Sequence, residues 1–132
     1  MIQEDRLAKT FTDLVKIDSV SKEEAAVCEF IQQILSDLGA EITIDEAAKK
    51  VGGNCGNLIA RFEGNGGVEP LMLNAHMDTV EPGRGITPLF SDGVFTSDGT
   101  TILGADDKSA LAIILETLRA VRENGLPCGP VD

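Results

Sequence analysis

The sequence predicts an α/β protein in which helices pack against a sheet. Apolar residues recur at helical spacing in three segments, and short strand-like runs lie between the second and third of them. Hydrophobic residues make up 42% of the 132 residues, which is enough for a core. Aromatic residues make up only 4%, and Trp and Tyr are absent. We therefore expect one small layered domain with an aliphatic core.

Two amphipathic helices are predicted before the strands. Their apolar stripes are formed by Leu7, Phe11, Leu14 and Val15, and then by Val27, Ile31, Ile34, Leu35 and Leu38. "SKEE" at residues 21–24 predicts a capping box for the second helix, with Ser21 as N-cap and Glu24 reaching back to it. Gly39 is suited to ending that helix, because glycine readily adopts the left-handed conformation.

The middle of the chain predicts three strands and a hairpin. "AEITIDEA" alternates between apolar and polar residues, and "NLIARF" is a second strand candidate. "PLMLNAH", residues 70–76, is a nearly continuous apolar run, typical of a strand covered on both faces. Glycine-rich stretches at 51–57 and 63–67 predict loops between these strands. Residues 81–104 predict a loop with a short hairpin around "SDGVF".

The last helix is predicted over residues 106–124. Its apolar face is formed by Ala110, Ile114, Leu118 and Val121, with Leu111 and Leu115 beside it. Gly125 and Pro127 end the helix. Gly129 and Pro130 predict a turn into a new strand that begins at Val131. We therefore expect residues 1–132 to be the N-terminal part of a longer domain.

Composition excludes several classes of function. The formal charge of −11 argues against a nucleic-acid partner, because phosphate contacts require a basic surface. Three scattered cysteines predict a reducing compartment rather than a disulfide framework. The N-terminus lacks the apolar run of a signal peptide, and no window approaches the length of a membrane span. We therefore predict a cytoplasmic protein with neither a nucleic-acid nor a membrane partner.

The only histidine, His76, lies at the end of the third predicted strand, two residues before Asp78. Residues i and i+2 of a strand project to the same side, so these two side chains point together. Open α/β sheets bind ligands at the carboxyl ends of their strands. A metal-bound histidine usually donates its second ring N–H to a carboxylate. The pair therefore suggests either a metal ligand with its orienting acid or a hydrogen-bonded structural pair.

Two adjacent acids, Asp106 and Asp107, begin the last predicted helix. Neighbouring carboxylates repel each other unless a cation is close, and the N-terminus of a helix compensates them in part. One interpretation is a helix cap by either acid, with Lys108 neutralising the other. For Asp106 we favour a metal role, because one acid is sufficient for capping.

"NAHMDTV" and "TTILGADDKSA", joined by a loop rich in glycine and proline, resemble the two N-terminal signatures of the M20 metallopeptidases. "DGTTILGADDKSA" is most similar to the tripeptide aminopeptidases of the peptidase T group. The resemblance extends over the whole chain. It implies the N-terminal portion of a zinc-exopeptidase-like three-layer αβα domain with a mostly parallel mixed sheet.

The resemblance also implies a role for each matching residue. His76 would be a ligand of one zinc, Asp78 would be the catalytic-site acid that holds its imidazole, and Asp106 would bridge two metal ions. The Asp106–Asp107 peptide bond would be cis. Two Zn²⁺ ions are implied, with Co²⁺ or Mn²⁺ as substitutes, and a shared water would attack the scissile amide.

Several groups of the family pattern have no counterpart in residues 1–132. These are the Glu-Glu pair that contains the general base, the remaining metal ligands and the smaller lid domain. We therefore expect residues 1–132 alone to be inactive. An unpaired sheet edge and uncovered apolar surface also predict self-association, and thus a homo-oligomer.

Three hypotheses remain open at this stage. The first is a dizinc aminopeptidase that releases N-terminal residues from short peptides. The second keeps amide hydrolysis but changes the substrate, as in a carboxypeptidase, a dipeptidase or an N-acyl amino-acid deacylase. The third is a non-catalytic fragment or interaction module.

Overall fold

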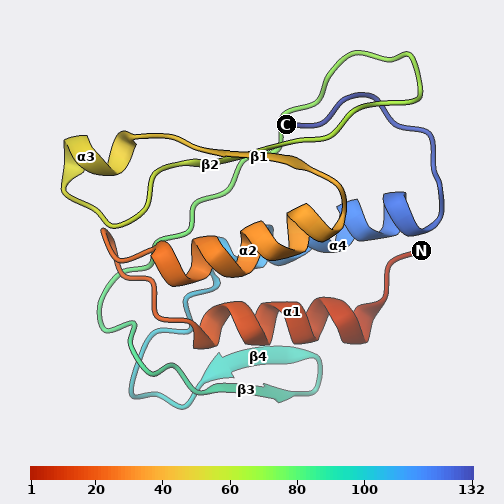
Figure 1. Cartoon of the computed structure of the whole chain (residues 1–132). Helices are drawn as coiled ribbons and strands as arrows, with labels where there is room; N and C mark the ends of the chain where they lie inside the picture. Colours follow the sequence, from red (N-terminus) through yellow and green to blue (C-terminus); the bar gives the residue numbers. More distant parts are fainter.

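The computed structural model describes residues 1–132 and contains four helices and four strands. Figure 1 shows their arrangement. In chain order, they are α1 (Glu4–Lys16), α2 (Ala25–Asp37), β1 (Glu41–Ile44), α3 (Ala47–Val51), β2 (Leu58–Arg61), β3 (Pro88–Ser91), β4 (Val94–Ser97) and α4 (Ala105–Glu123). No helix combines the length and the apolar character needed to cross a membrane.

The core lies between the helices and one face of the β1–β2 pair. α2 and α4 lie along this face, and α1 packs against α4 on the side away from the sheet (Figure 1). The buried cluster joins α1, α2 and α4 to Phe62 and consists of Phe11, Leu14, Val15, Val27, Ile31, Leu35, Phe62, Leu111, Ala112, Leu115 and Leu118. Most positions of the first two predicted helical stripes are in this cluster, because each stripe faces the other helices. On α4, Leu118 is the one residue of the predicted face in the cluster, and the buried side is centred on Leu111 and Leu115.

The strands form two antiparallel pairs. β1 and β2 pair from Glu41 opposite Arg61 to Ile44 opposite Leu58. β3 and β4 form the predicted hairpin beside α1, and its two-residue turn is Asp92–Gly93. Both turn residues have positive φ, 53° and 79°, as the tight turns that suit the twist of a hairpin require.

Two extended segments continue the sheet beyond β2. Val131 bridges Phe62 in antiparallel sense and Leu71 in parallel sense, so residues 130–132 lie between β2 and the segment that leads to His76. At the far end of that segment, Thr79 bridges Val20 in parallel sense. The mixed α/β class is confirmed, and the parallel pairing is confined to these two bridges.

Three local predictions differ from the structure. The predicted strand over residues 70–76 is an extended segment without a continuous ladder, because its pairing with residues 130–132 extends only as far as Leu73. A short helix, α3, occupies the predicted junction between strand and loop. The helices cover one face of the β1–β2 pair, whereas Ile59, which projects to the other face, is exposed. Residues 1–132 therefore contain only two of the three layers of the expected αβα domain.

The capping box predicted at residues 21–24 is wrong. α2 begins at Ala25, and its N-cap residue, Glu24, makes no side-chain capping bond. The Ala25 N–H donates instead to Asn54 Oδ1 at 3.0 Å, and Glu24 accepts from the Lys22 N–H at 2.6 Å. A residue from a distant loop thus satisfies the helix end, which leaves the Ser21 hydroxyl free for another partner.

Candidate functional site

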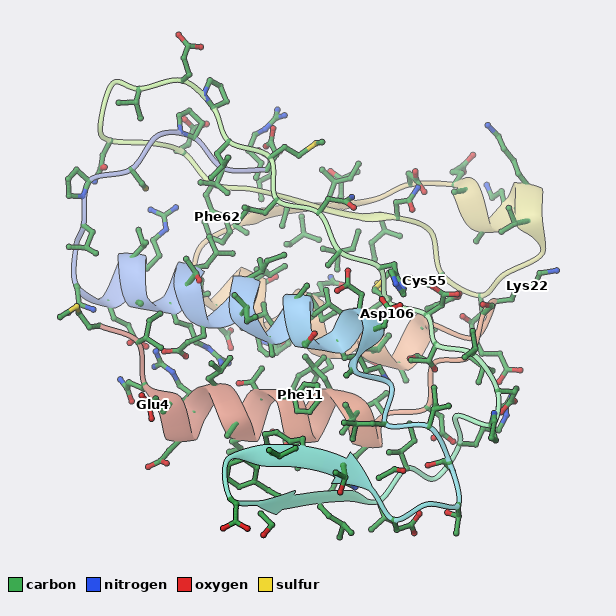
Figure 2. All side chains as sticks on the ribbon, turned by 180° about the vertical axis from the view of Figure 1, so that it is seen from behind. Glu4, Phe11, Lys22, Cys55, Phe62 and Asp106 are labelled. Atoms are coloured by element: carbon green, nitrogen blue, oxygen red, sulfur yellow. The ribbon has the colours of Figure 1, made fainter.

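His76 and Asp106 converge at one end of the sheet, although 30 residues separate them in the sequence. His76 Nε2 lies 3.1 Å from Asp106 Oδ1. Asp106 lies at the start of α4 (Figure 2), and its side chain is 96% exposed, while that of His76 is 51% exposed. One edge of the imidazole and one carboxylate oxygen therefore meet where a solute can reach both.

Asp78 holds the other nitrogen of the same imidazole. His76 Nδ1 lies 3.0 Å from the Asp78 carbonyl oxygen and 3.0 Å from Asp78 Oδ1. Both neighbours of Nδ1 are acceptors, and so is Asp106 Oδ1 beside Nε2, so the charged ring donates on both sides. In a neutral ring with the proton on Nδ1, the lone pair on Nε2 faces Asp106.

Acidic neighbours determine the protonation of the imidazole. Partial burial acts to lower the pKa of His76, but the hydrogen bond to Asp106, the hydrogen bond to the Asp78 backbone and the charges of Asp78 and Asp107 outweigh it. The pKa of His76 is therefore raised above its ordinary value. This is the behaviour expected of a cation-attracting cluster.

The capping alternative for the two acids is not observed. Asp106 and Asp107 have non-helical backbone angles, and α4 makes no side-chain capping bond. Asp107 Oδ2 faces the His76 backbone N–H at 3.4 Å. The peptide bond between the two acids is cis, as the resemblance implies.

Lys108 does not neutralise either acid. Its side chain is fully buried, and Nζ donates to the Ile17 carbonyl oxygen at 2.6 Å. Burial lowers the pKa of Lys108 to about 8, and the nearby charge of Asp18 opposes this shift. Lys108 therefore fastens the segment after α1 to the start of α4 and leaves Asp106 without a lysine partner.

Two hollows meet at His76 and Asp78. The smaller, about 330 Å³, lies between this pair and residues 102–106. The larger, about 700 Å³, runs beneath the sheet between β2, residues 72–78 and the apolar sides of α2 and α4. The imidazole and the Asp78 carboxylate thus line both hollows.

Ser21 is a neighbour of the site that the sequence did not reveal. Its hydroxyl donates to Asp78 Oδ2, so Asp78 is held from one side by Ser21 and from the other by His76. The pattern "SKEE" indicated a helix cap at this serine, and no local signal pointed to Asp78, which is 57 residues away. Only the tertiary contact between Val20 and Thr79 brings them together.

A model of a known family matches residues 57–129, more than half of the chain, and its description is peptidase family M28. The chain belongs to peptidase family M28. The matched stretch contains every site residue described above except Ser21. The family is a peptidase family, and families of this kind are generally metal-dependent.

Solved structures show what this M28 member resembles. A tripeptidase from Staphylococcus aureus superposes with a TM-score of 0.95 at 41% identity, over 99% of this chain and 35% of that one. Aminopeptidase PepT from Bacillus cereus gives a TM-score of 0.95 at 42% identity, over 98% of this chain and 35% of that one. The predicted likeness to the N-terminal part of peptidase T-like exopeptidases is confirmed.

One curated relative is a carboxypeptidase by name. Carboxypeptidase G2 from a Pseudomonas strain is 31% identical over 94% of this chain and 30% of its own length. The chain spans about a third of the length of the curated relatives that it matches.

The paired donor atoms fit a zinc ion. Zinc accepts imidazole nitrogen and carboxylate oxygen at about 2.0–2.2 Å, so two such ligands of a tetrahedral ion lie roughly 3.3–3.6 Å apart. The 3.1 Å between His76 Nε2 and Asp106 Oδ1 is close to that separation. No group of three or more such side chains occurs in residues 1–132, so the chain offers only part of a coordination sphere.

Proposed function

We propose that this chain is the N-terminal part of the catalytic domain of an M20-type metallopeptidase that releases N-terminal residues from short peptides. The proposal rests on one observation, the 3.1 Å approach of His76 Nε2 to Asp106 Oδ1 at the open end of the sheet. The superposition on a tripeptidase and on aminopeptidase PepT supports a tripeptidase-like aminopeptidase. We place the protein in a reducing compartment such as the cytoplasm, in keeping with its three scattered cysteines.

In this proposal, each residue of the site has one task. His76 would hold a zinc ion through Nε2, and the Asp106 carboxylate would be the second group of this chain to hold the metal. Asp78 keeps the proton on Nδ1, so that the other nitrogen presents its lone pair. When bound, the two ions supply an activated water and polarise the scissile carbonyl. Cobalt or manganese can replace zinc in such a ligand set.

The general base and the remaining metal ligands are not among these residues. A complete site needs further carboxylate or imidazole groups, and the single histidine is already engaged. We therefore expect residues 1–132 alone to bind metal weakly and to lack peptidase activity.

The similarity to carboxypeptidase G2 favours a second candidate, amide hydrolysis next to a free carboxylate or an acyl group. An assay of the parent protein with zinc on tripeptides that carry a free or an acetylated N-terminus separates the two. Release of the N-terminal residue from the free peptide alone supports the aminopeptidase. Cleavage of only the acetylated peptide overturns it, and cleavage of neither overturns both.

Metal binding is tested on the 132-residue chain itself. Titration calorimetry with ZnCl₂ is expected to give one weak site that disappears in His76→Ala and Asp106→Asn. A control variant, Asp13→Asn, changes an acid on α1 that pairs with Lys9 and should leave the titration unchanged. Equal zinc binding by the wild type and all three variants would contradict the proposed ligands.

A further inference from the structure

We propose that Ser21 is a positioning residue of this metal site and that its hydroxyl orients Asp78 so that His76 keeps the proton on Nδ1. The inference rests on the proposed function, because the task of the imidazole is to present Nε2 to a cation. It adds a residue from the segment between α1 and α2, outside the stretch that matches the family model.

The first step of the argument is the partner of the Ser21 hydroxyl. It donates to Asp78 Oδ2, while Asp78 Oδ1 lies 3.0 Å from His76 Nδ1. The two carboxylate oxygens thus have different partners. A carboxylate can rotate about its Cβ–Cγ bond, and a donor on one oxygen restricts that rotation. The hydroxyl therefore holds Oδ1 toward the imidazole.

The second step is that the backbone around Ser21 is tied to the same strand. The Thr79 N–H donates to the Ser19 carbonyl at 2.8 Å, and the Ser21 N–H donates to the Thr79 carbonyl at 3.2 Å. Buried Lys108 holds Ile17, two residues before Ser19, against the start of α4. The segment is consequently fixed both to the strand that carries Asp78 and to the helix that carries Asp106.

The third step concerns the turn after Ser21. Lys22 has φ of 80°, in the left-handed region that residues with a side chain seldom adopt. The Glu23 N–H bonds to the Val20 carbonyl, and the Lys22 carbonyl accepts from the Asn54 N–H. Asn54 also caps α2 at Ala25, so the hydroxyl of Ser21 is not needed there. Strain at such a residue is maintained where the surrounding structure determines the turn, often beside a functional site.

The chain allows an unusually direct test, because His76 is its only histidine. Nitrogen-15 NMR of the metal-free protein, at a pH above the imidazole titration, reports which ring nitrogen carries the proton. The wild type is expected to show the Nδ1–H form. Ser21→Ala is expected to give a mixture of the two tautomers, and Ser21→Thr, which retains a hydroxyl, should restore the single form.

Zinc affinity provides a second readout. Loss of a residue that orients a metal-binding histidine typically reduces affinity 10–100-fold, and we expect about tenfold for Ser21→Ala. The matched control is Ser91→Ala, since Ser91 Oγ donates to Asp92 Oδ2 at 3.2 Å in the β3–β4 hairpin. This control should leave both the tautomer and the zinc affinity unchanged. Amide spectra of each variant establish that it is folded.

The two proposals fail in different ways. A folded Ser21→Ala with the wild-type tautomer and wild-type zinc affinity overturns the role of Ser21. If the wild type and His76→Ala show the same zinc titration, the metal site fails, whereas a changed tautomer in Ser21→Ala still supports the contact with Asp78.

Discussion

A single imidazole connects the acids of this site. His76 lies 3.0 Å from Asp78 and 3.1 Å from Asp106, on opposite ring nitrogens. The two carboxylates face different ring nitrogens, and in the proposed site Asp78 would fix the tautomer while Asp106 would supply a second metal ligand. Substitution of Asp78 should therefore change the tautomer of His76, whereas substitution of Asp106 should change metal binding.

We expect Asp106→Asn to lower the pKa of His76 toward its ordinary value. Burial already acts to lower that pKa, and the hydrogen bond to Asp106 is the largest effect that raises it. The titration of the imidazole proton signals by NMR measures the change. Asp98→Asn, at an exposed acid that bonds to Thr100, is the control and should not shift the curve. A titration of Asp106→Asn that overlays the wild type would contradict the geometry.

At the scale of elements, the loop before β2 closes around one carboxylate. Asp45 Oδ1 accepts from the N–H groups of Ala47 and Asn57, and Oδ2 accepts from Asn57 Nδ2. The hydrogen bond from Ala47, followed by those from Asn57, lowers the pKa of Asp45. A Cβ at Gly56 would lie 2.0 Å from the Asp45 carbonyl oxygen, so the loop has no space for a side chain there.

Gly56→Ala is therefore expected to destabilise the chain by roughly 1–3 kcal/mol, because overpacking forces the backbone to move. Gly53→Ala is the matched control, since its Cβ would meet atoms only at 3.6 Å or more. Urea denaturation of both variants measures the difference. Equal midpoints would show that the loop adapts without cost.

α1 is joined to α4 through a buried acid. Glu116 is fully buried and accepts from Arg6 Nε at 2.7 Å, from Arg6 Nη2 at 3.0 Å and from the Gln3 N–H at 2.8 Å. The hydrogen bond from Arg6 lowers the pKa of Glu116 below its ordinary 4.5. Glu116 is thus ionised and compensated inside the protein.

Arg6→Ala should cost about 3 kcal/mol at pH 7, because it leaves a buried charge without its main partner. Lys9→Ala breaks the exposed pair with Asp13 and should cost less than about 0.5 kcal/mol. The contribution of the Arg6 pair is present above pH 4.5 and is lost as the pH falls through the lowered pKa of Glu116. Urea titrations at pH 7 and pH 3 should therefore show the Arg6→Ala deficit shrinking in acid.

At the scale of the whole molecule, the segment that leads to His76 is paired at one end only. The N–H groups of Leu71 and Leu73 donate to the carbonyls of Pro130 and Asp132, whereas those of Ala75 and Met77 have no backbone partner. These four residues share one edge, because alternate residues of a strand bond to the same side.

We expect the Ala75 and Met77 amides to exchange with D₂O at least tenfold faster than those of Leu71 and Leu73. Exchange depends on hydrogen bonding and local opening, so the break in pairing should appear as a step along the segment. Two-dimensional NMR at neutral pD measures it. Uniform protection across the four amides would show that this edge is covered in solution.

Exposed apolar residues of the sheet predict self-association. The side chains of Ile44, Ile59, Leu71 and Met72 are all exposed, and the segment that carries the last two has an unpaired edge. Light scattering should show a mass that rises with concentration and falls in Met72→Glu. Leu89→Glu, which places the same charge in the distant β3–β4 hairpin, is the control. A monomer at high concentration would contradict the prediction.

Many local features of this molecule can be predicted from its amino-acid sequence. The helical stripes, the hairpin turn and the two short motifs with His76 and Asp106 depend on neighbours within a few residues, and the structure contains each of these helices and the turn. The cap of α2, the burial of Lys108 and the bond from Ser21 to Asp78 join residues that are distant in the sequence. Local propensity carries no information about such partners, because packing brings them together. The sequence by itself therefore determined the elements and the candidate donors, and only the tertiary structure decided which side chains orient them.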